Sequence, residues 1–267
     1  MKVKLLYFSP TGTTKKIVDT IASSLQTEKL ESIDFTKKKI REDAGTDFAG
    51  DLVIIGAPVY YGRMPKVVTE YLSKLKVNNI PAVLVVVYGN RDYEGSLLEL
   101  YDTVRAAGFR PIACAAFIGE HSFSTEDLPM AQGRPDESDL DKAKQFGATI
   151  QKDFDTLINN NLAQTFIPSD IDYRSKEIPK LPVTLVTLTE QCIKCESCIE
   201  LCPADAIAFD EQSNLVTDMD SCIICFACVK YCPVQARGIY DPFWSSNMAN
   251  LQKKCLARKE PEVFFSV

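Results

Sequence analysis

The first 160 residues alternate between short apolar runs and segments in which apolar positions recur at helical spacing. The strongest apolar runs are VKLLYF (3–8), DLVIIGA (51–57), AVLVVVYG (82–89) and PIACAAFIG (111–119), and a weaker one is EKLESIDF (28–35). Such runs are typical of strands buried on both faces of a parallel sheet. Helical patterns follow at 14–26, 65–76, 96–107 and 137–159, whereas the connection at 36–50 is short for a regular helix. The alternation predicts a doubly wound α/β domain with five strands over residues 1–160.

The rest of the chain follows different patterns. Residues 161–185 contain three prolines (Pro168, Pro179 and Pro182) and no clear period, which predicts a linker. Residues 186–240 contain two copies of one segment offset by 30 positions, CIKCESCIELCPADAI and CIICFACVKYCPVQAR. The tail, 241–267, has a helical stretch near 245–259 and ends in the strand-like EVFFSV. Because exposing Phe264 and Phe265 to water would cost free energy, we expect the tail to pack back on one domain.

Composition and charge exclude several classes of protein. The 267 residues are 46% hydrophobic, which is enough for a substantial core. The net charge of −6 argues against nucleic acid as a main partner. No apolar stretch approaches the roughly 20 residues that span a bilayer, and MKVKLLYFSP lacks the features of a signal peptide. We therefore expect a cytoplasmic protein without a membrane partner. In that compartment the ten cysteines are not expected to form a disulfide framework.

Eight of the ten cysteines form two runs of identical spacing, C-x2-C-x2-C-x3-C-P. Both copies resemble the bacterial two-cluster ferredoxin without departure from its motif, which implies a small α+β domain with two 4Fe–4S clusters. The ligand sets that the resemblance implies are Cys192, Cys195, Cys198 and Cys232 for one cluster, and Cys222, Cys225, Cys228 and Cys202 for the other. The alternative is a pair of zinc sites, which usually show two separated C-x2-C pairs. Cys114 and Cys255 lack companions at ligand spacing, and Cys114 fits an ordinary core position.

Acidic residues are concentrated in the cysteine-rich segment. Between 186 and 240, eight acids and three bases give 3 − 8 = −5, most of the excess negative charge of the chain. Reduced clusters add further negative charge, which favours a redox partner protein with a basic docking patch. The alternative is a solvated acidic surface without a docking role.

A loop rich in hydroxyl groups, SPTGTT (9–14), lies between the first predicted strand and the first predicted helix. Backbone N–H groups converge at a helix N-terminus and attract phosphate, and the hydroxyls add further donors. Gly12 lets the backbone approach closely, whereas Pro10 removes one N–H donor. The chain has neither G-x-G-x-x-G nor G-K-[ST], which argues against a dinucleotide and a P-loop.

The segment 9–14 instead resembles the flavodoxin phosphate loop, S/T-x-T-G-x-T. Two further loops support the resemblance because each follows an apolar strand: APVYYGRMP (57–65) and GNRDYEG (89–95). The resemblance implies FMN at the switch point of a sheet with strand order 2-1-3-4-5. One side of the flavin ring would contact Val59, Tyr60, Tyr61 and Gly62, and the other Asn90 and Tyr93. The expected cofactor-binding residues are Ser9, Thr11, Gly12, Thr13, Thr14, Pro58, Val59, Tyr60, Tyr61, Gly62, Gly89, Asn90 and Tyr93. The alternative is a flavodoxin-like fold that binds no flavin and uses the first loop as a helix cap.

A long third loop, GEHSFSTEDLPMAQGRP (119–135), holds the single histidine of the chain. His121 at the end of a strand is a candidate catalytic acid, and the alternative role is a hydrogen bond that positions the loop. Arg134 in the same loop suits either a phosphate or an acidic neighbour.

Taken together, the chain resembles the flavodoxin–ferredoxin fusion proteins of anaerobes, with a flavodoxin-like domain at 1–160, a linker at 161–185, a two-cluster ferredoxin domain at 186–240 and a tail at 241–267. Three functions compete. The first is an electron carrier that links one-electron and two-electron partners through FMN and the clusters. The second is an oxidoreductase that reduces a small molecule such as a quinone, nitro or disulfide compound, and the third is a redox sensor that acts through the tail. Related flavodoxin-like reductases often form dimers, so a homodimer stays open.

Overall fold

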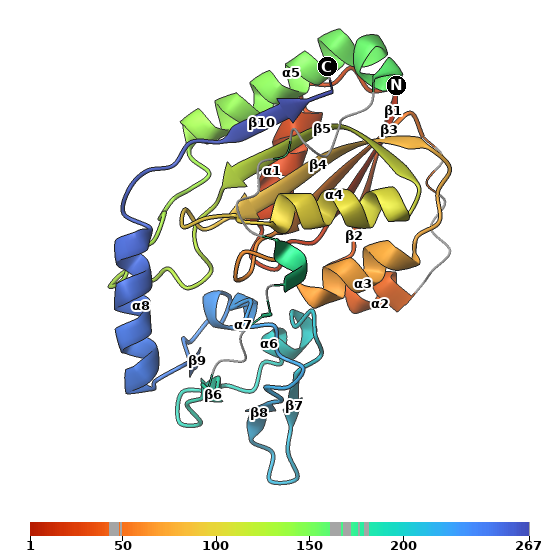
Figure 1. Cartoon of the computed structure of the whole chain (residues 1–267). Coiled ribbons are helices and arrows are strands. Elements are labelled where there is room, and N and C mark those ends of the chain that lie inside the picture. The colour runs from red at the N-terminus through yellow and green to blue at the C-terminus, as the bar shows by residue number, and fades with distance from the viewer. Residues whose placement is uncertain are drawn as a thin grey trace.

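A six-stranded sheet forms the centre of the chain in this computed structural model, which describes residues 1–42, 48, 50–160, 167, 172–175, 177–178 and 182–266 (Figure 1). Five parallel strands have the order β2-β1-β3-β4-β5, which confirms the predicted 2-1-3-4-5 arrangement. Their bounds are β1 Lys2–Tyr7, β2 Lys29–Asp34, β3 Leu52–Pro58, β4 Ile80–Tyr88 and β5 Phe109–Ile118. All seven residues of β3 are buried, as the near-continuous apolar run required.

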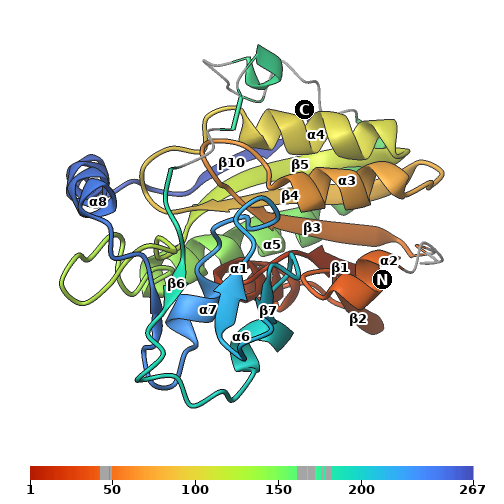
Figure 2. The same cartoon turned by 90° about the horizontal axis from the view of Figure 1, so that it is seen from below.

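Helices cover both faces of this sheet (Figure 2). The apolar stripes of α1 and α5 pack on one face, and those of α3 and α4 pack on the other. Their bounds are α1 Thr13–Ala22, α3 Lys66–Lys74, α4 Ser96–Ala106 and α5 Glu137–Asn159. Within the short 36–50 connection lies a five-residue helix, α2 Lys38–Glu42, and residues 43–47 and 49 lie outside the described part.

The sixth strand comes from the tail, so the expectation of five strands was incomplete. β10, Glu262–Phe265, pairs antiparallel with β5, with Phe264 opposite Cys114. An unpaired β5 would present a row of free N–H and C=O groups, and β10 satisfies them. The Phe265 ring lies 5.3 Å from that of Phe146 on α5, so the tail does pack back on the first domain.

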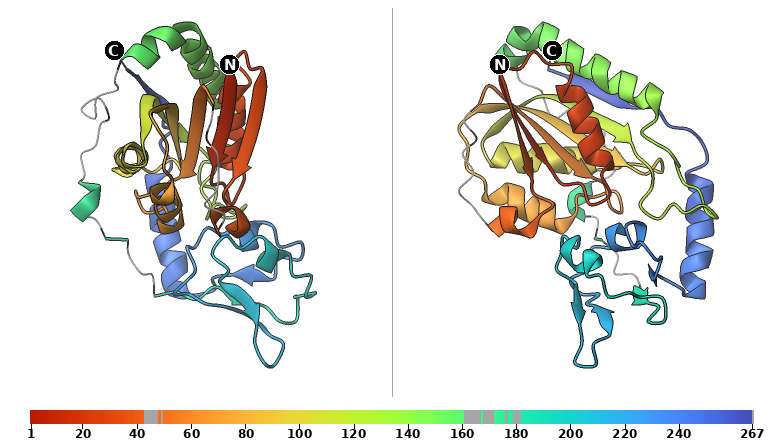
Figure 3. Two further views of the ribbon diagram at one scale, coloured as in Figure 1. Left: turned by 90° about the vertical axis from the view of Figure 1, so that its right-hand side faces the viewer. Right: turned by 180° about the vertical axis from the view of Figure 1, so that it is seen from behind.

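The cysteine-rich segment lies beyond the carboxyl ends of the parallel strands (Figure 3). It forms two antiparallel strand pairs, β6 Val186–Thr187 with β9 Arg237–Gly238 and β7 Ile207–Phe209 with β8 Leu215–Thr217. Two one-turn helices, α6 Ser197–Glu200 and α7 Ala227–Lys230, occupy equivalent positions in the two copies. Helix α8, Pro242–Lys254, then leads to β10, and its Trp244 and Met248 pack on the core of the cysteine-rich segment.

Much of the predicted linker, 161–185, lies outside the described residues. Within it, the 3-10 turn η2 (Tyr173–Ser175) contacts α4, because the Tyr173 hydroxyl donates to Asp102 Oδ2 at 2.7 Å. Among the helices that the structure describes, none is long and apolar enough to cross a bilayer.

Candidate functional site

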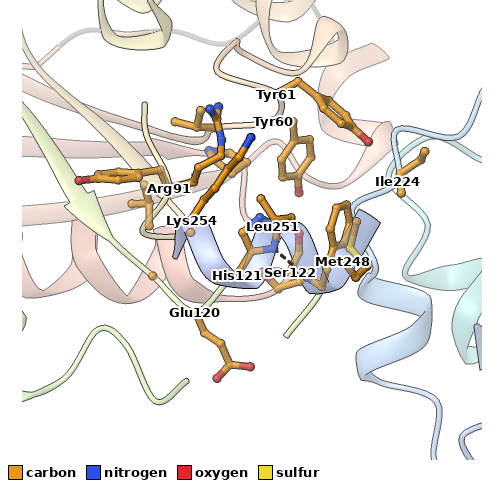
Figure 4. Close-up of a pocket in the computed structure, with 18 of the residues that line it drawn as sticks. Tyr60, Tyr61, Arg91, Glu120, His121, Ser122, Ile224, Met248, Leu251 and Lys254 are labelled. Atoms are coloured by element: carbon orange, nitrogen blue, oxygen red, sulfur yellow. Dashed lines mark hydrogen bonds between the residues drawn. The ribbon is translucent and has the colours of Figure 1, made fainter. Parts of the chain in front are cut away.

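A cavity of about 420 Å3 lies at the carboxyl ends of the parallel strands (Figure 4). This volume is within the usual range of small-molecule and cofactor sites. Four of its walls are the loops that the sequence indicated, and two come from the second cysteine run and the tail. The lining comprises residues 11, 13, 58–61, 87–89, 91, 94, 119–123 and 224, together with one face of α8.

The hydroxyl loop has the geometry of an anion site at the start of α1. Gly12 is the N-cap residue with φ 84°, a conformation that favours glycine. Ser9 Oγ accepts from Lys15 N at 3.0 Å, which fixes the turn. Thr11 and Thr13 line the cavity, whereas Thr14 is 1% exposed and Thr14 Oγ1 has no hydrogen-bond partner among the described residues. An unsatisfied buried hydroxyl is costly, and a bound phosphate would supply the missing partner, so the loop fits the expected FMN.

The second loop presents two tyrosines to the cavity. Tyr61 and Gly62 both have positive φ, and Tyr60 and Arg63 form a backbone bridge that closes the turn. Glu99 Oε2 on α4 anchors the end of the loop by accepting from Met64 N at 2.9 Å. Burial raises the pKa of Tyr61 to about 12, and within the described residues its hydroxyl is buried without a partner. This second orphaned hydroxyl also fits a site completed by a polar ligand.

The loop at 89–95 departs from the expectation, because Asn90 and Tyr93 do not line the cavity. The Asn90 side chain binds the tail instead, donating to the carbonyl oxygens of Cys255 at 2.7 Å and Ala257 at 2.9 Å. The Tyr93 hydroxyl donates to Glu262 Oε2 of β10 at 3.0 Å. The loop thus faces the tail with these two side chains, and the cavity with Gly89 and Arg91.

His121 lies in the cavity wall against Gly89. A Cβ at Gly89 would lie 2.3 Å from His121 Cδ2, so the close approach of the ring requires glycine there. His121 Nδ1 accepts from Phe123 N at 3.1 Å, and the ring proton of the neutral form is therefore on Nε2. Burial, together with the charges of Lys230 and Arg91, lowers the pKa of His121 to about 4. A neutral imidazole at physiological pH is a hydrogen-bond donor, which argues against the role of catalytic acid that the sequence suggested.

Protein contacts account for Arg134, and Cys114 has the core position that the sequence indicated. Arg134 is buried in an ion pair with Asp139 of α5, and its Nη2 donates to the Lys259 carbonyl oxygen at 3.1 Å, so it meets an acidic neighbour. Cys114 is fully buried in β5, as a core residue would be, and burial raises the pKa of its thiol.

The remaining walls of the cavity were not foreseen. Ile224, between two cysteines of the second run, lines the cavity together with Met248 and Leu251 of α8 (Figure 4). Trp244 of the same helix also lines it. An aromatic cluster fixes this arrangement, because the ring of Phe123 lies 4.7 Å from Phe226 and 4.9 Å from Trp244. Each contact joins residues more than a hundred positions apart, so no local pattern signalled it. The helical pattern near 245–259 predicted the element but not the surface that it covers.

The cysteines of the two runs form two groups in space. A second cavity is lined by Cys192, Cys195, Cys198 and Cys232. In the other group, burial raises the pKa of Cys225 to about 12, and the charges of Cys228, Cys222 and Cys202 contribute to the shift. The two groups correspond to the ligand sets that the ferredoxin resemblance implies.

The backbone of the two runs repeats together with the sequence. Residues with positive φ recur 30 positions apart at Lys194 and Ile224, at Glu196 and Phe226, and at Asp205 and Gln235. The matching amides of Ala206 and Ala236 donate to Cys202 Sγ at 3.3 Å and to Cys232 Sγ at 3.2 Å. Left-handed residues turn successive N–H groups inward, which forms the anion-binding concavity typical of Fe–S sites. Both runs therefore fit a cluster.

One buried cation lies between the two groups of cysteines. Arg237 is 3% exposed and lines the cavity of the first group. Its Nη2 approaches Cys228 Sγ of the second group at 3.9 Å and donates to Thr217 Oγ1 at 2.6 Å. A guanidinium in this position offsets the negative charge of both sets of thiolates.

The two groups also differ in depth. Cys225 and Cys228 are buried, and Cys225 directly follows Ile224 in the wall of the larger cavity, whereas Cys195 is exposed. We refer to the set Cys222, Cys225, Cys228 and Cys202 as the inner group, and to the set Cys192, Cys195, Cys198 and Cys232 as the outer group.

Comparison with known families matches two separate parts of the chain. Residues 4–120 match the family of flavodoxin domains, and residues 184–233 match the family of 4Fe-4S dicluster domains. The cofactors that these two domains imply are FMN and two 4Fe–4S clusters. No curated relative matches the chain.

Several solved structures are similar to the chain. A flavodoxin from the domain Archaea is 14% identical, with 58% of this chain and 99% of that chain covered and a TM-score of 0.38. A Fusobacterium nucleatum flavodoxin bound to flavin mononucleotide is 16% identical, with 58% and 97% covered and a TM-score of 0.39. Rubredoxin oxygen:oxidoreductase from the anaerobe Desulfovibrio gigas is 18% identical, with 59% and 37% covered and a TM-score of 0.43.

Proposed function

We propose that this chain, a flavodoxin domain fused to a two-cluster 4Fe–4S ferredoxin domain, carries electrons between FMN in the larger cavity and a redox partner protein at the outer cysteine group. FMN exchanges two electrons together or one at a time, and each cluster exchanges one. The observation that supports the proposal best is the position of Ile224. This side chain lies in the cavity wall and belongs to the loop between Cys222 and Cys225 of the inner group.

The outer group offers the contact point for a partner. Cys195 is exposed, and Ile193 beside it is 62% exposed. Within residues 190–200, three glutamates (Glu190, Glu196 and Glu200) and one lysine (Lys194) are exposed, so the exposed charge of this segment is net negative beside an apolar side chain. Such a surface suits a partner with a basic patch. Reducing conditions that keep these thiols available make the cytoplasm the compartment that we propose.

A basic one-electron acceptor protein such as cytochrome c tests the route, because a folded protein cannot enter the cavity. The fully reduced full-length protein, loaded with FMN and clusters, would be mixed anaerobically with oxidised cytochrome c, and the reoxidation of flavin followed by its absorbance. We expect Cys198→Ala, which removes one ligand of the outer group, to slow flavin reoxidation at least about tenfold and to lower its dependence on ionic strength. The control is Cys114→Ala, which changes a cysteine outside both runs. Equal flavin rates in the wild type and Cys198→Ala would refute the route.

A second function, FMN-dependent reduction of a small molecule such as a quinone, nitro or disulfide compound, is favoured by the cover that α8 places over the cavity. Met248 and Leu251 form an apolar wall where a protein partner would otherwise reach the flavin. In this function the Nε2–H group of His121 would donate a hydrogen bond to the bound molecule. Saturable quinone reduction that Met248→Trp abolishes, with cytochrome c reduction unchanged, would support the enzyme. Quinone reduction that is linear in concentration and insensitive to Met248→Trp would contradict it.

A further inference from the structure

The second cysteine run reaches the hydroxyl loop of the first domain. Tyr231, which follows α7 directly, has its hydroxyl oxygen 3.5 Å from the position that a Cβ on Gly12 would occupy. The residue is 47% exposed, and its hydroxyl has no hydrogen-bond partner within the described part of the chain. A free phenol group therefore lies over the loop where the FMN phosphate is expected.

Neighbouring contacts hold this tyrosine in place. Lys230 Nζ forms an ion pair with Glu120 of the third loop at 2.6 Å, and both side chains are partly buried. On the other side of α7, Phe226 packs in the aromatic cluster with Phe123 and Trp244. The orientation of Tyr231 thus follows from two independent contacts between the domains.

Holding a cluster does not require this tyrosine. The two runs are offset by 30 positions, so the first run has Leu201 where the second has Tyr231, and Glu200 where the second has Lys230. The same one-turn helix precedes both positions. We therefore relate Lys230 and Tyr231 of the second run to the surface that this run faces, which is the flavodoxin domain.

The loop itself offers few charged donors to a phosphate. Lys15 Nζ binds Asp19 at 2.5 Å, and Lys16 Nζ donates to the Pro135 carbonyl oxygen at 3.0 Å. A phosphate here depends on neutral donors, such as backbone amides and hydroxyls, and an additional hydroxyl is a substantial share of them.

We propose that the Tyr231 hydroxyl donates a hydrogen bond to the FMN phosphate, so that the ferredoxin domain supplies one phosphate-binding group of the flavin site. The inference rests on the proposed FMN site. It makes FMN a ligand of both domains.

Titration with FMN and with riboflavin, which lacks the phosphate, tests this role. Full-length protein with intact clusters would be freed of flavin and titrated anaerobically, with binding followed by quenching of flavin fluorescence. We expect Tyr231→Phe to weaken FMN binding about tenfold and to leave riboflavin binding unchanged, because only the phosphate contact is lost. Tyr240→Phe is the matched control, since this exposed tyrosine of the same domain lies against Gly238 rather than against the hydroxyl loop, and it should change neither affinity.

Two results would overturn the inference. One is FMN affinity that Tyr231→Phe leaves unchanged, and the other is an equal loss of FMN and riboflavin, which would indicate a structural role. Neither result touches the proposed function, which fails separately if the wild-type protein binds no FMN.

Discussion

Asn90 provides a sharp test of how the tail is attached. Its side chain makes three hydrogen bonds to residues 255–259: two donated to the carbonyl oxygens of Cys255 at 2.7 Å and Ala257 at 2.9 Å, and one accepted from Lys259 N at 3.0 Å. Asn90 is 3% exposed, so water cannot replace these bonds without local opening. It is also left-handed, with φ 64°.

Replacing Asn90 by alanine removes all three bonds at once. Each is worth about 1 kcal/mol net, which gives a loss of about 3 kcal/mol, or roughly a hundredfold increase in the population of the detached tail. Alanine at positive φ adds about 1 kcal/mol of strain to the folded loop. The second effect must be separated from the first.

Asn79→Ala supplies that separation. Asn79 also has positive φ, 55°, but it is exposed and its side chain makes no hydrogen bond within the described residues. This control therefore carries the backbone strain alone. Its tail should behave like that of the wild type.

Hydrogen–deuterium exchange of peptides that cover 255–266, followed by mass spectrometry, measures the detachment directly. We expect exchange in Asn90→Ala to be faster by about a hundredfold, and exchange in Asn79→Ala to match the wild type. If the tail of Asn90→Ala exchanged at the wild-type rate, the three bonds would not hold it, and the account of this loop would be wrong.

Three further predictions concern the cofactor sites and the histidine. Thr14→Ala should weaken FMN binding about tenfold in a fluorescence titration and leave the iron content unchanged, and equal FMN affinity would contradict a phosphate contact. Cys198→Ala should halve the iron content and leave FMN bound. Cys225→Ala should also halve the iron content, and it should weaken FMN binding because the loop that precedes Cys225 is a wall of the flavin cavity. Equal FMN affinity in the two variants would refute the assignment of inner and outer groups. In the folded protein the pKa of His121 is about 4, below its ordinary value of 6.5. The neutral imidazole therefore contributes to the free energy of unfolding, and this contribution is complete above pH 6.5 and is lost as the pH falls toward 4. The thermal midpoint should therefore fall more steeply over this range in the wild type than in His121→Gln, and parallel pH profiles would show that His121 is not buried in solution.

The sequence predicted those features that depend on local pattern. Buried strands such as β3 are continuous apolar runs, and the cysteine spacing repeats residue for residue, so both were visible without a structure. The hydroxyl loop was identifiable because its hydroxyl residues all lie within the short segment 9–14. The start of α8 at Pro242 also had a local signal, an Asp-Pro pair whose aspartate caps the helix, although the predicted bounds missed it.

Features that depend on distant segments were missed. Asn90 and Tyr93 have the residue types of a flavin loop, but their partners lie about 165 positions later, in the tail. Ile224 and Met248 reach the cavity only because two domains pack together. Periodicity reports which face of an element is apolar, not which surface it meets.

The return of β10 to the first sheet makes the ferredoxin domain an insertion between α5 and the last strand rather than an appendage at one end (Figure 1). A module joined by a single tether can swivel, and the gap between its redox centres and those of its neighbour then varies. Here the polypeptide leaves the flavodoxin domain and re-enters it, so the ferredoxin domain is attached at two points. Rotation about one hinge would require β10 to separate from β5. Covalent connectivity as well as surface contacts thereby constrains the distance between the cavity and the inner group, and the electron transfer proposed above would need no docking step within the molecule.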